Sequence, residues 1–181
     1  MDRLASLAAM LVLAFAPQAR AADCGALLAE HVRTDLALDF DAFDQADATG
    51  WRPLADAGCD AETATLIARY AAARPHPHPV LAWHRAQALA RAGDTAAAIA
   101  AARATLRPAD AEARADFQWN AYAEATIAFL QGDRATLQAR REQLARAAAG
   151  HPENQPNLNS VDRLQRCFGQ PYKQAYLCPG E

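Results

Sequence analysis

Three histidines close together are the side chains in this sequence best suited to bind a metal. His76 and His78 flank a proline, and His84 follows shortly after them. Imidazole is the commonest transition-metal ligand near neutral pH, and imidazoles two residues apart can share an ion. The pair lies in a proline-rich connector with no cysteine or carboxylate close in sequence, which favours a rigid polar loop. We therefore predict no metal and no cofactor, with a metal-binding scaffold centred on His76 and His78 as an alternative.

Acidic residues and serines give little support for catalysis. The aspartates between residues 39 and 47 lack the glycine and the terminal glutamate of a calcium loop, so they indicate a solvated helix end. Ser160 is the only serine after residue 21, and the sequence contains no Gly-x-Ser-x-Gly motif. A carboxylate pair could be drawn from Asp110, Glu112, Asp116 and Glu124. Such residues usually line a solvated groove in helical arrays, so we expect no catalytic residue.

The composition favours an all-α protein. The chain has 181 residues, the length of one ordinary domain, and it contains 49 alanines against 8 glycines. Alanine has the highest helix propensity and is depleted in strands. Basic residues number 18 and acidic residues 21, a formal net charge of −3, which argues against a nucleic-acid partner.

Residues 1–21 have the features of an export signal. Arg3 is followed by an apolar run over residues 4–15, and Ala19 and Ala21 are small residues where a signal peptidase would cleave. The run is shorter than the roughly 20 residues that span a bilayer. We predict cleavage after Ala21, no stable membrane insertion afterwards, and a periplasmic or secreted location. An uncleaved anchor or a buried N-terminal helix is the alternative.

Four cysteines follow this segment, and in an oxidising compartment an even number predicts two disulfides. Three connectivities are possible. We favour Cys167–Cys178, which closes a short loop containing glycine and proline, together with Cys24–Cys59 at the N-terminal end. Free, buried and inert thiols are the alternative.

Glycines punctuate the middle of the chain at regular intervals. Gly58, Gly93 and Gly132 are 35 and 39 residues apart, and each separates two helical stretches. A glycine can adopt the left-handed conformation that ends a helix, and an aspartate after it can cap the next helix. We therefore predict helical hairpins over residues 50–152, with one long, largely buried helix at 111–130 that contains Phe117. An N-terminal helical segment at 22–49, with a helix at 26–43, precedes them. A capping helix and a cysteine-containing tail follow at 153–181.

The middle unit resembles a tetratricopeptide repeat (TPR). The resemblance rests on residues 82–94, with Trp83 in the first helix and Gly93-Asp94 at the turn, and continues through Ala98 to Leu106-Arg107-Pro108. The flanking units match chiefly through their glycines and aspartates, and Ala90 replaces an aromatic residue of the family pattern. The resemblance implies a TPR-like α-solenoid of stacked antiparallel hairpins.

In such arrays the first helix of each hairpin supplies the inner face. The residues implied here are Arg85, Gln87, Arg91, Asn120, Tyr122 and Glu124. Arginine and amide side chains of this kind can hold an extended peptide or a protein surface. We therefore predict a scaffold that binds a protein or peptide and makes no bonds. A small periplasmic enzyme, or an accessory subunit of one, is the alternative function.

Overall fold

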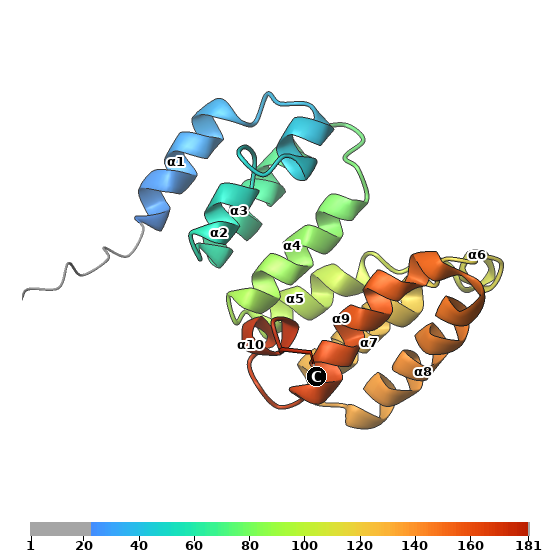
Figure 1. The fold of residues 1–181 in the computed structure, drawn as a ribbon. Helices are drawn as coiled ribbons and strands as arrows, with labels where there is room; N and C mark the ends of the chain where they lie inside the picture. Colours follow the sequence, from blue (N-terminus) through green and yellow to red (C-terminus); the bar gives the residue numbers. More distant parts are fainter. Residues whose placement is uncertain (1–22, 181) are drawn as a thin grey trace, which may run out of the picture.

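The computed structural model describes residues 23–180, so the predicted export signal lies outside the described part. Within that part every regular element is a helix and no strand occurs, which confirms the all-α prediction (Figure 1). The elements are α1 (Cys24–Thr34), the π-helical turn η1 (Asp41–Gln45), α2 (Arg52–Asp56), α3 (Asp60–Ala72), α4 (Val80–Arg91), α5 (Thr95–Arg103), α6 (Ala109–Ala113), α7 (Trp119–Gln131), α8 (Arg134–Gly150), the 3-10 turn η2 (Pro152–Asn154), α9 (Gln155–Arg166) and α10 (Tyr172–Tyr176).

The three punctuating glycines all lie at bends between consecutive helices, as predicted. Gly58, Gly93 and Gly132 have φ values of +80°, +85° and +72°, in the region where a side chain would be strained. Asp94 and Asp133 cap the helices that follow, accepting hydrogen bonds from backbone N–H groups at 3.1 and 3.0 Å. The hairpins are therefore α2–α3, α4–α5 and α7–α8.

The helix predicted at 26–43 ends early, at Thr34, because the next residues bond elsewhere. Asp35 is buried, and its side chain accepts a hydrogen bond from the backbone N–H of Gly50 at 2.8 Å. A Cβ on Gly50 would lie 1.8 Å from the carbonyl oxygen of Phe43, so only glycine fits there. These contacts hold the chain after α1 in a bend, so the helix does not continue to residue 43.

The long helix expected over residues 111–130 is also interrupted. It divides into the short α6 and α7, with residues 114–118 between them outside any helix. The buried Asn154 accounts for the break: its Oδ1 accepts from the N–H of Gln118 at 2.8 Å, and its Nδ2 donates to the carbonyl of Asp116 at 2.9 Å. Asn154 lies in η2, far along the chain, so this interruption depends on tertiary contacts.

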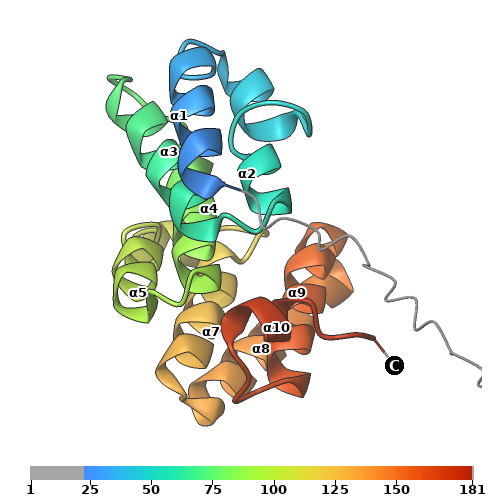
Figure 2. The same cartoon turned by 90° about the vertical axis from the view of Figure 1, so that its left-hand side faces the viewer.

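Two apolar clusters form the core, and α4 contributes to both. Leu81 belongs to the N-terminal cluster with Phe43 and Tyr70, whose rings stack with centroids 3.5 Å apart. Trp83 belongs to the C-terminal cluster, where its ring centroid lies 4.9 Å from that of Tyr122. Figure 2 shows α4 running between the N-terminal helices and the C-terminal ones. This helix therefore joins the two halves of the molecule.

Helices pack mainly on their neighbours in the chain, α3 on α4, α4 on α5, α5 on α7, α7 on α8 and α8 on α9. α1 also packs on α3 and α7 on α9, and among these pairs the elements farthest apart in the chain are α4 and α10, because α10 returns to contact α4. In a simple solenoid each unit contacts only the adjacent ones. The C-terminal tail of this chain instead folds back on the middle of the array.

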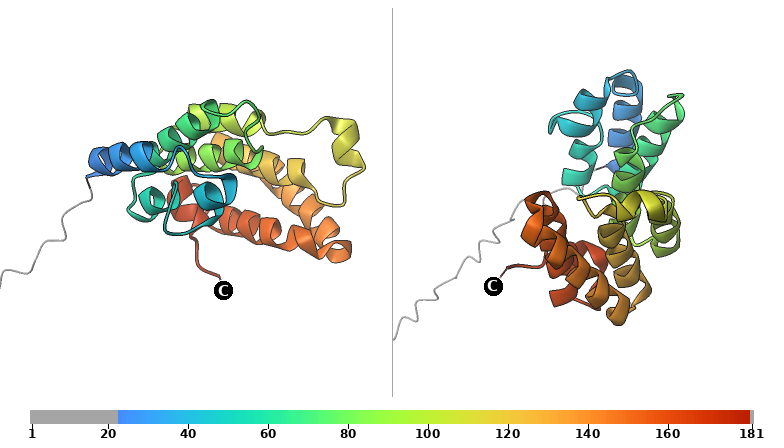
Figure 3. Two further views of the ribbon diagram at one scale, coloured as in Figure 1. Left: turned by 90° about the horizontal axis from the view of Figure 1, so that it is seen from above. Right: turned by 90° about the vertical axis from the view of Figure 1, so that its right-hand side faces the viewer.

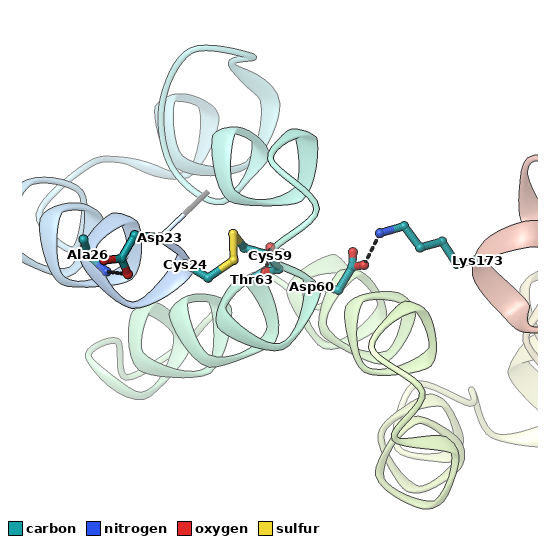
Figure 4. The surroundings of a disulfide bond; sticks show 7 residues. All are labelled: Asp23, Cys24, Ala26, Cys59, Asp60, Thr63 and Lys173. Atoms are coloured by element: carbon teal, nitrogen blue, oxygen red, sulfur yellow. Dashed lines mark hydrogen bonds and ion pairs between the residues drawn. A yellow bond between two sulfur atoms is a disulfide. The ribbon is translucent and has the colours of Figure 1, made fainter. Parts of the chain in front are cut away.

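Two disulfides join the cysteine pairs that the sequence favoured. Cys24–Cys59 ties α1 to the start of α3, and Cys167–Cys178 joins the end of α9 to the tail after α10. Asp60 follows Cys59 directly, and Figure 4 shows its carboxylate turned toward Lys173 of α10. The Lys173 Nζ donates to Asp60 at 2.7 Å, so an ion pair connects the N-terminal half to the tail.

Candidate functional site

Two of the six residues predicted to form a binding face are instead part of the core. Gln87 and Tyr122 are 9% and 4% exposed, and the Gln87 Nε2 donates to the Tyr122 hydroxyl at 3.3 Å. Burial raises the pKa of Tyr122 well above its ordinary value, so the phenol stays protonated. The C-terminal helices and α10 cover this side of α4, which leaves the pair no open face.

The charged members of the predicted set do not meet in one place. The Arg91 Nε donates to Asp60 at 2.9 Å, so Arg91 and Lys173 share one buried carboxylate. Glu124 pairs with Arg140 across the α7–α8 hairpin at 2.8 Å. These residues stabilise contacts between helices. Neither Arg91 nor Glu124 lines the opening between the start of α4 and the segment at 104–119.

An apolar opening lies elsewhere, between the start of α4 and the segment at 104–119. We call it the apolar groove; it has a volume of about 680 Å³. Its lining includes His78, Ala82, Ala104, Arg107, Phe117 and Trp119. Figure 3 shows α6, in yellow, projecting with its flanking segments from the body of the molecule. A cavity of this size is within the range of known ligand sites.

A second opening of about 310 Å³ adjoins the apolar groove, and we call it the side groove. The two grooves share His78, Pro79, Ala82 and Ala104. The side groove extends to Arg85, and none of the other five predicted binding residues lines either groove. Ala82 and Ala104 are exposed. Because their side chains are small, another chain could approach the helix backbone closely here.

Two aromatic side chains form one wall of the apolar groove, and the sequence did not predict this role for them. Phe117 and Trp119 are half-buried, with ring centroids 6.4 Å apart in a stacked arrangement. The Trp119 indole N–H donates to the carbonyl of Thr105 at 2.9 Å, which holds the ring against the residues just after α5. We expected both aromatic residues inside one buried helix, and the break in that helix is what turns them to the groove.

Asn120, from the predicted set, holds this wall in place. Its Oδ1 accepts from the N–H of Arg107 at 2.8 Å, and its Nδ2 donates to the Arg107 carbonyl at 2.9 Å. Its own N–H donates to the buried Glu112 at 2.7 Å. Asn120 is thus a positioning residue for the groove. Glu112, one of the candidates for a carboxylate pair, accepts this hydrogen bond and so helps to hold Asn120 in position.

The histidine connector borders both grooves. The His78 ring stacks on Phe40 with centroids 4.1 Å apart, and its Nδ1 accepts from the N–H of Val80 at 3.3 Å. Across residues 23–180, the one group of three side chains close enough to share an ion is Cys24, Cys59 and Glu62. Both sulfurs of that group are joined in a disulfide, so it offers no free thiolate.

His84 lies away from the grooves and contacts a buried acid. Its Nδ1 is 2.7 Å from Oδ1 of Asp44, a fully buried residue of η1 that also accepts from the Trp51 indole at 2.9 Å. Burial alone raises the pKa of Asp44, but the hydrogen bond and charge of His84 outweigh it, so the pKa lies below 3.8. An Asp–His pair occurs in catalytic triads, but His84 bonds no nucleophile in the described structure. The pair anchors η1 to α4.

None of the helices described in residues 23–180 is long and apolar enough to cross a membrane. Comparison of the chain with family models, with curated proteins and with solved structures gives no match. What the protein does must therefore be inferred from its own residues, and the apolar groove is the site they support best.

Proposed function

We propose that this protein is exported to the periplasm or secreted, and that it binds a protein or peptide segment in the apolar groove. Two disulfides suit an oxidising compartment. Glycine-bent hairpins packed in chain order suit a TPR-like scaffold, the class of fold that the middle unit resembles. Binding of this kind requires no catalytic group and no cofactor.

The observation that carries the proposal is the composition of the groove. Half-buried aromatic rings stand on one side, and exposed alanines of α4 and the end of α5 form the floor. Ligand sites are concave and lined mainly by apolar and aromatic side chains with a few polar groups, and this groove has that composition. Aromatic-lined grooves are a recurrent way of holding an extended peptide segment.

Filling the groove tests the proposal. A random peptide library is selected on the purified protein, and the selected peptides are then titrated onto two double variants. Ala82→Gln/Ala104→Gln places two long neutral side chains on the groove floor, whereas Ala96→Gln/Ala100→Gln places them on exposed positions of α5 away from it. We expect about tenfold weaker binding, roughly 1.4 kcal/mol, for the groove variant alone.

The control must retain wild-type affinity, and both variants must melt at similar temperatures. The proposal is wrong if no peptide is selected, or if the selected peptides bind the groove variant as tightly as the wild type.

A further inference from the structure

The charge of the two grooves differs from that of the whole chain. Although the net charge is −3, the residues lining the apolar groove and the side groove include Arg85, Arg107 and His78 and no aspartate or glutamate. Both arginines are therefore next to apolar surface with no acidic residue in the lining. An occupant that is apolar in the middle and negative at its ends matches this distribution.

Arg85 lacks the partners that other half-buried arginines of this fold have. Its Nε is buried and has no hydrogen-bond partner among residues 23–180. The Nε atoms of Arg140 and Arg163 are buried without a hydrogen-bond partner in the same way, but their guanidinium groups bond through other nitrogens, to Gln143 at 3.0 Å and to Ser160 at 3.1 Å. In residues 23–180 the Arg85 guanidinium forms no hydrogen bond at all. Arg85 as a whole is half-buried, so a carboxylate arriving in the side groove can bond the exposed part of its guanidinium.

Arg107 lines the apolar groove together with Phe117 and Trp119. Its side chain is 41% exposed, its Nη1 donates to the carbonyl of Phe117 at 3.3 Å, and Glu112 is 3.7 Å away. These contacts hold the guanidinium in position but leave other N–H groups facing solvent. A second carboxylate can bind there without displacing the contact that orients the arginine.

We propose that the segment bound in the groove is acidic at both ends of an apolar stretch, with one carboxylate on Arg85 and the other on Arg107. This inference rests on the proposed function and specifies the chemistry of its partner. Small exposed alanines lie between the two arginines, at positions common to both openings, so the apolar stretch crosses them. A fatty acid carries only one carboxylate and would engage a single arginine, and a nucleic acid would leave the apolar floor unused.

Matched peptides test this assignment by fluorescence polarisation on the full protein. The acidic probe is a blocked, labelled Asp-Leu-Ala-Phe-Leu-Leu-Glu, the neutral probe has Asn and Gln at its ends, and the basic probe has Lys at both. Because hydrogen bonds to charged groups are the strong ones, we expect the acidic probe to bind about tenfold more tightly than the neutral one.

Variants assign that preference to residues. Arg85→Gln should reduce the preference for the acidic probe to about threefold or less, whereas Arg69→Gln, at an exposed position of α3 outside both grooves, should leave it unchanged. Arg107→Glu should bind the basic probe better than the wild type does, a gain that partial unfolding could not produce. Since Arg107 is exposed, this variant also covers the case in which Arg85→Gln does not fold.

The outcomes separate the two proposals. Equal affinity for the acidic and neutral probes overturns the acidic-segment assignment while the groove remains a peptide site. Preference for a single-carboxylate fatty acid over the acidic peptide also overturns it. Failure of every probe, together with failure of the library selection, overturns the proposed function itself.

Discussion

Removing the Cys24–Cys59 disulfide is expected to destabilise the protein more than removing Cys167–Cys178. A disulfide stabilises a fold mainly because it restricts the unfolded chain, and the effect grows with the length of the loop that it closes. The sequence separations are 35 residues for the first pair and 11 for the second. The two disulfides therefore allow an internal comparison within one fold.

The chain-entropy relation gives about 4 kcal/mol for the longer loop and about 3 kcal/mol for the shorter one at room temperature. Replacing each pair by alanine leaves comparable small gaps, because Cys59 and Cys178 are both buried. The two cavity contributions therefore nearly cancel in the comparison. The expected difference in the free energy of unfolding is about 1 kcal/mol, or roughly 2 to 4 °C in melting temperature for a chain of this size.

Urea unfolding followed by circular dichroism measures this difference on Cys24→Ala/Cys59→Ala and Cys167→Ala/Cys178→Ala. Both variants should unfold at lower urea than the wild type, with the first one less stable. A reductant should lower the wild-type midpoint and leave a variant that lacks both disulfides unchanged. Larger destabilisation from the tail pair would refute the loop-entropy reasoning, and no destabilisation from either would show that neither disulfide stabilises the fold.

Two further predictions concern the packing and the buried acids. Ala98 is fully buried in α5, so Ala98→Leu should lower the free energy of unfolding by about 1 to 3 kcal/mol through overpacking, measured by urea unfolding; a neutral result would mean that α5 is not tightly packed there. The pKa values of Asp35 and Asp44 in the folded protein are lower than the ordinary 3.8. Burial raises each pKa, but the hydrogen bonds to each carboxylate and the charge of its histidine partner, His31 for Asp35 and His84 for Asp44, outweigh the effect of burial. The unfolded chain therefore binds more protons in acid, so stability should be full above about pH 5 and fall as the pH drops through 3.8 toward the lower folded values. Asp44→Asn should flatten this dependence in urea titrations across that range, and an unchanged slope would contradict the assigned pKa.

The helix bends that the sequence predicted correctly are fixed by neighbouring residues. A left-handed glycine followed by a helix-capping aspartate is a local signal, and Gly93 and Gly132 lie at the predicted bends. The interruptions depend on residues distant in sequence: Gly50 reaches Asp35, and Asn154 takes the backbone groups around Asp116. Hydrophobic periodicity contains no trace of such contacts, so the helices at 26–43 and 111–130 were predicted too long.

The groove could not be predicted for the same physical reason. Residues such as Gln87 and Tyr122 have the polarity of a binding face, but they lie on the side of α4 that the returning tail covers. Phe117 and Trp119 have the apolarity of a core, and Trp119 does pack on Trp83 with ring centroids 5.1 Å apart, but both rings also line the groove because the polar bonds of Asn154 and Asn120 hold the break before α7. Polarity therefore did not indicate exposure: Gln87 and Tyr122 are buried, whereas Phe117 and Trp119 line the groove. Which side of a helix is open is decided by what folds back against it, so the Arg85 side of α4 became the open one.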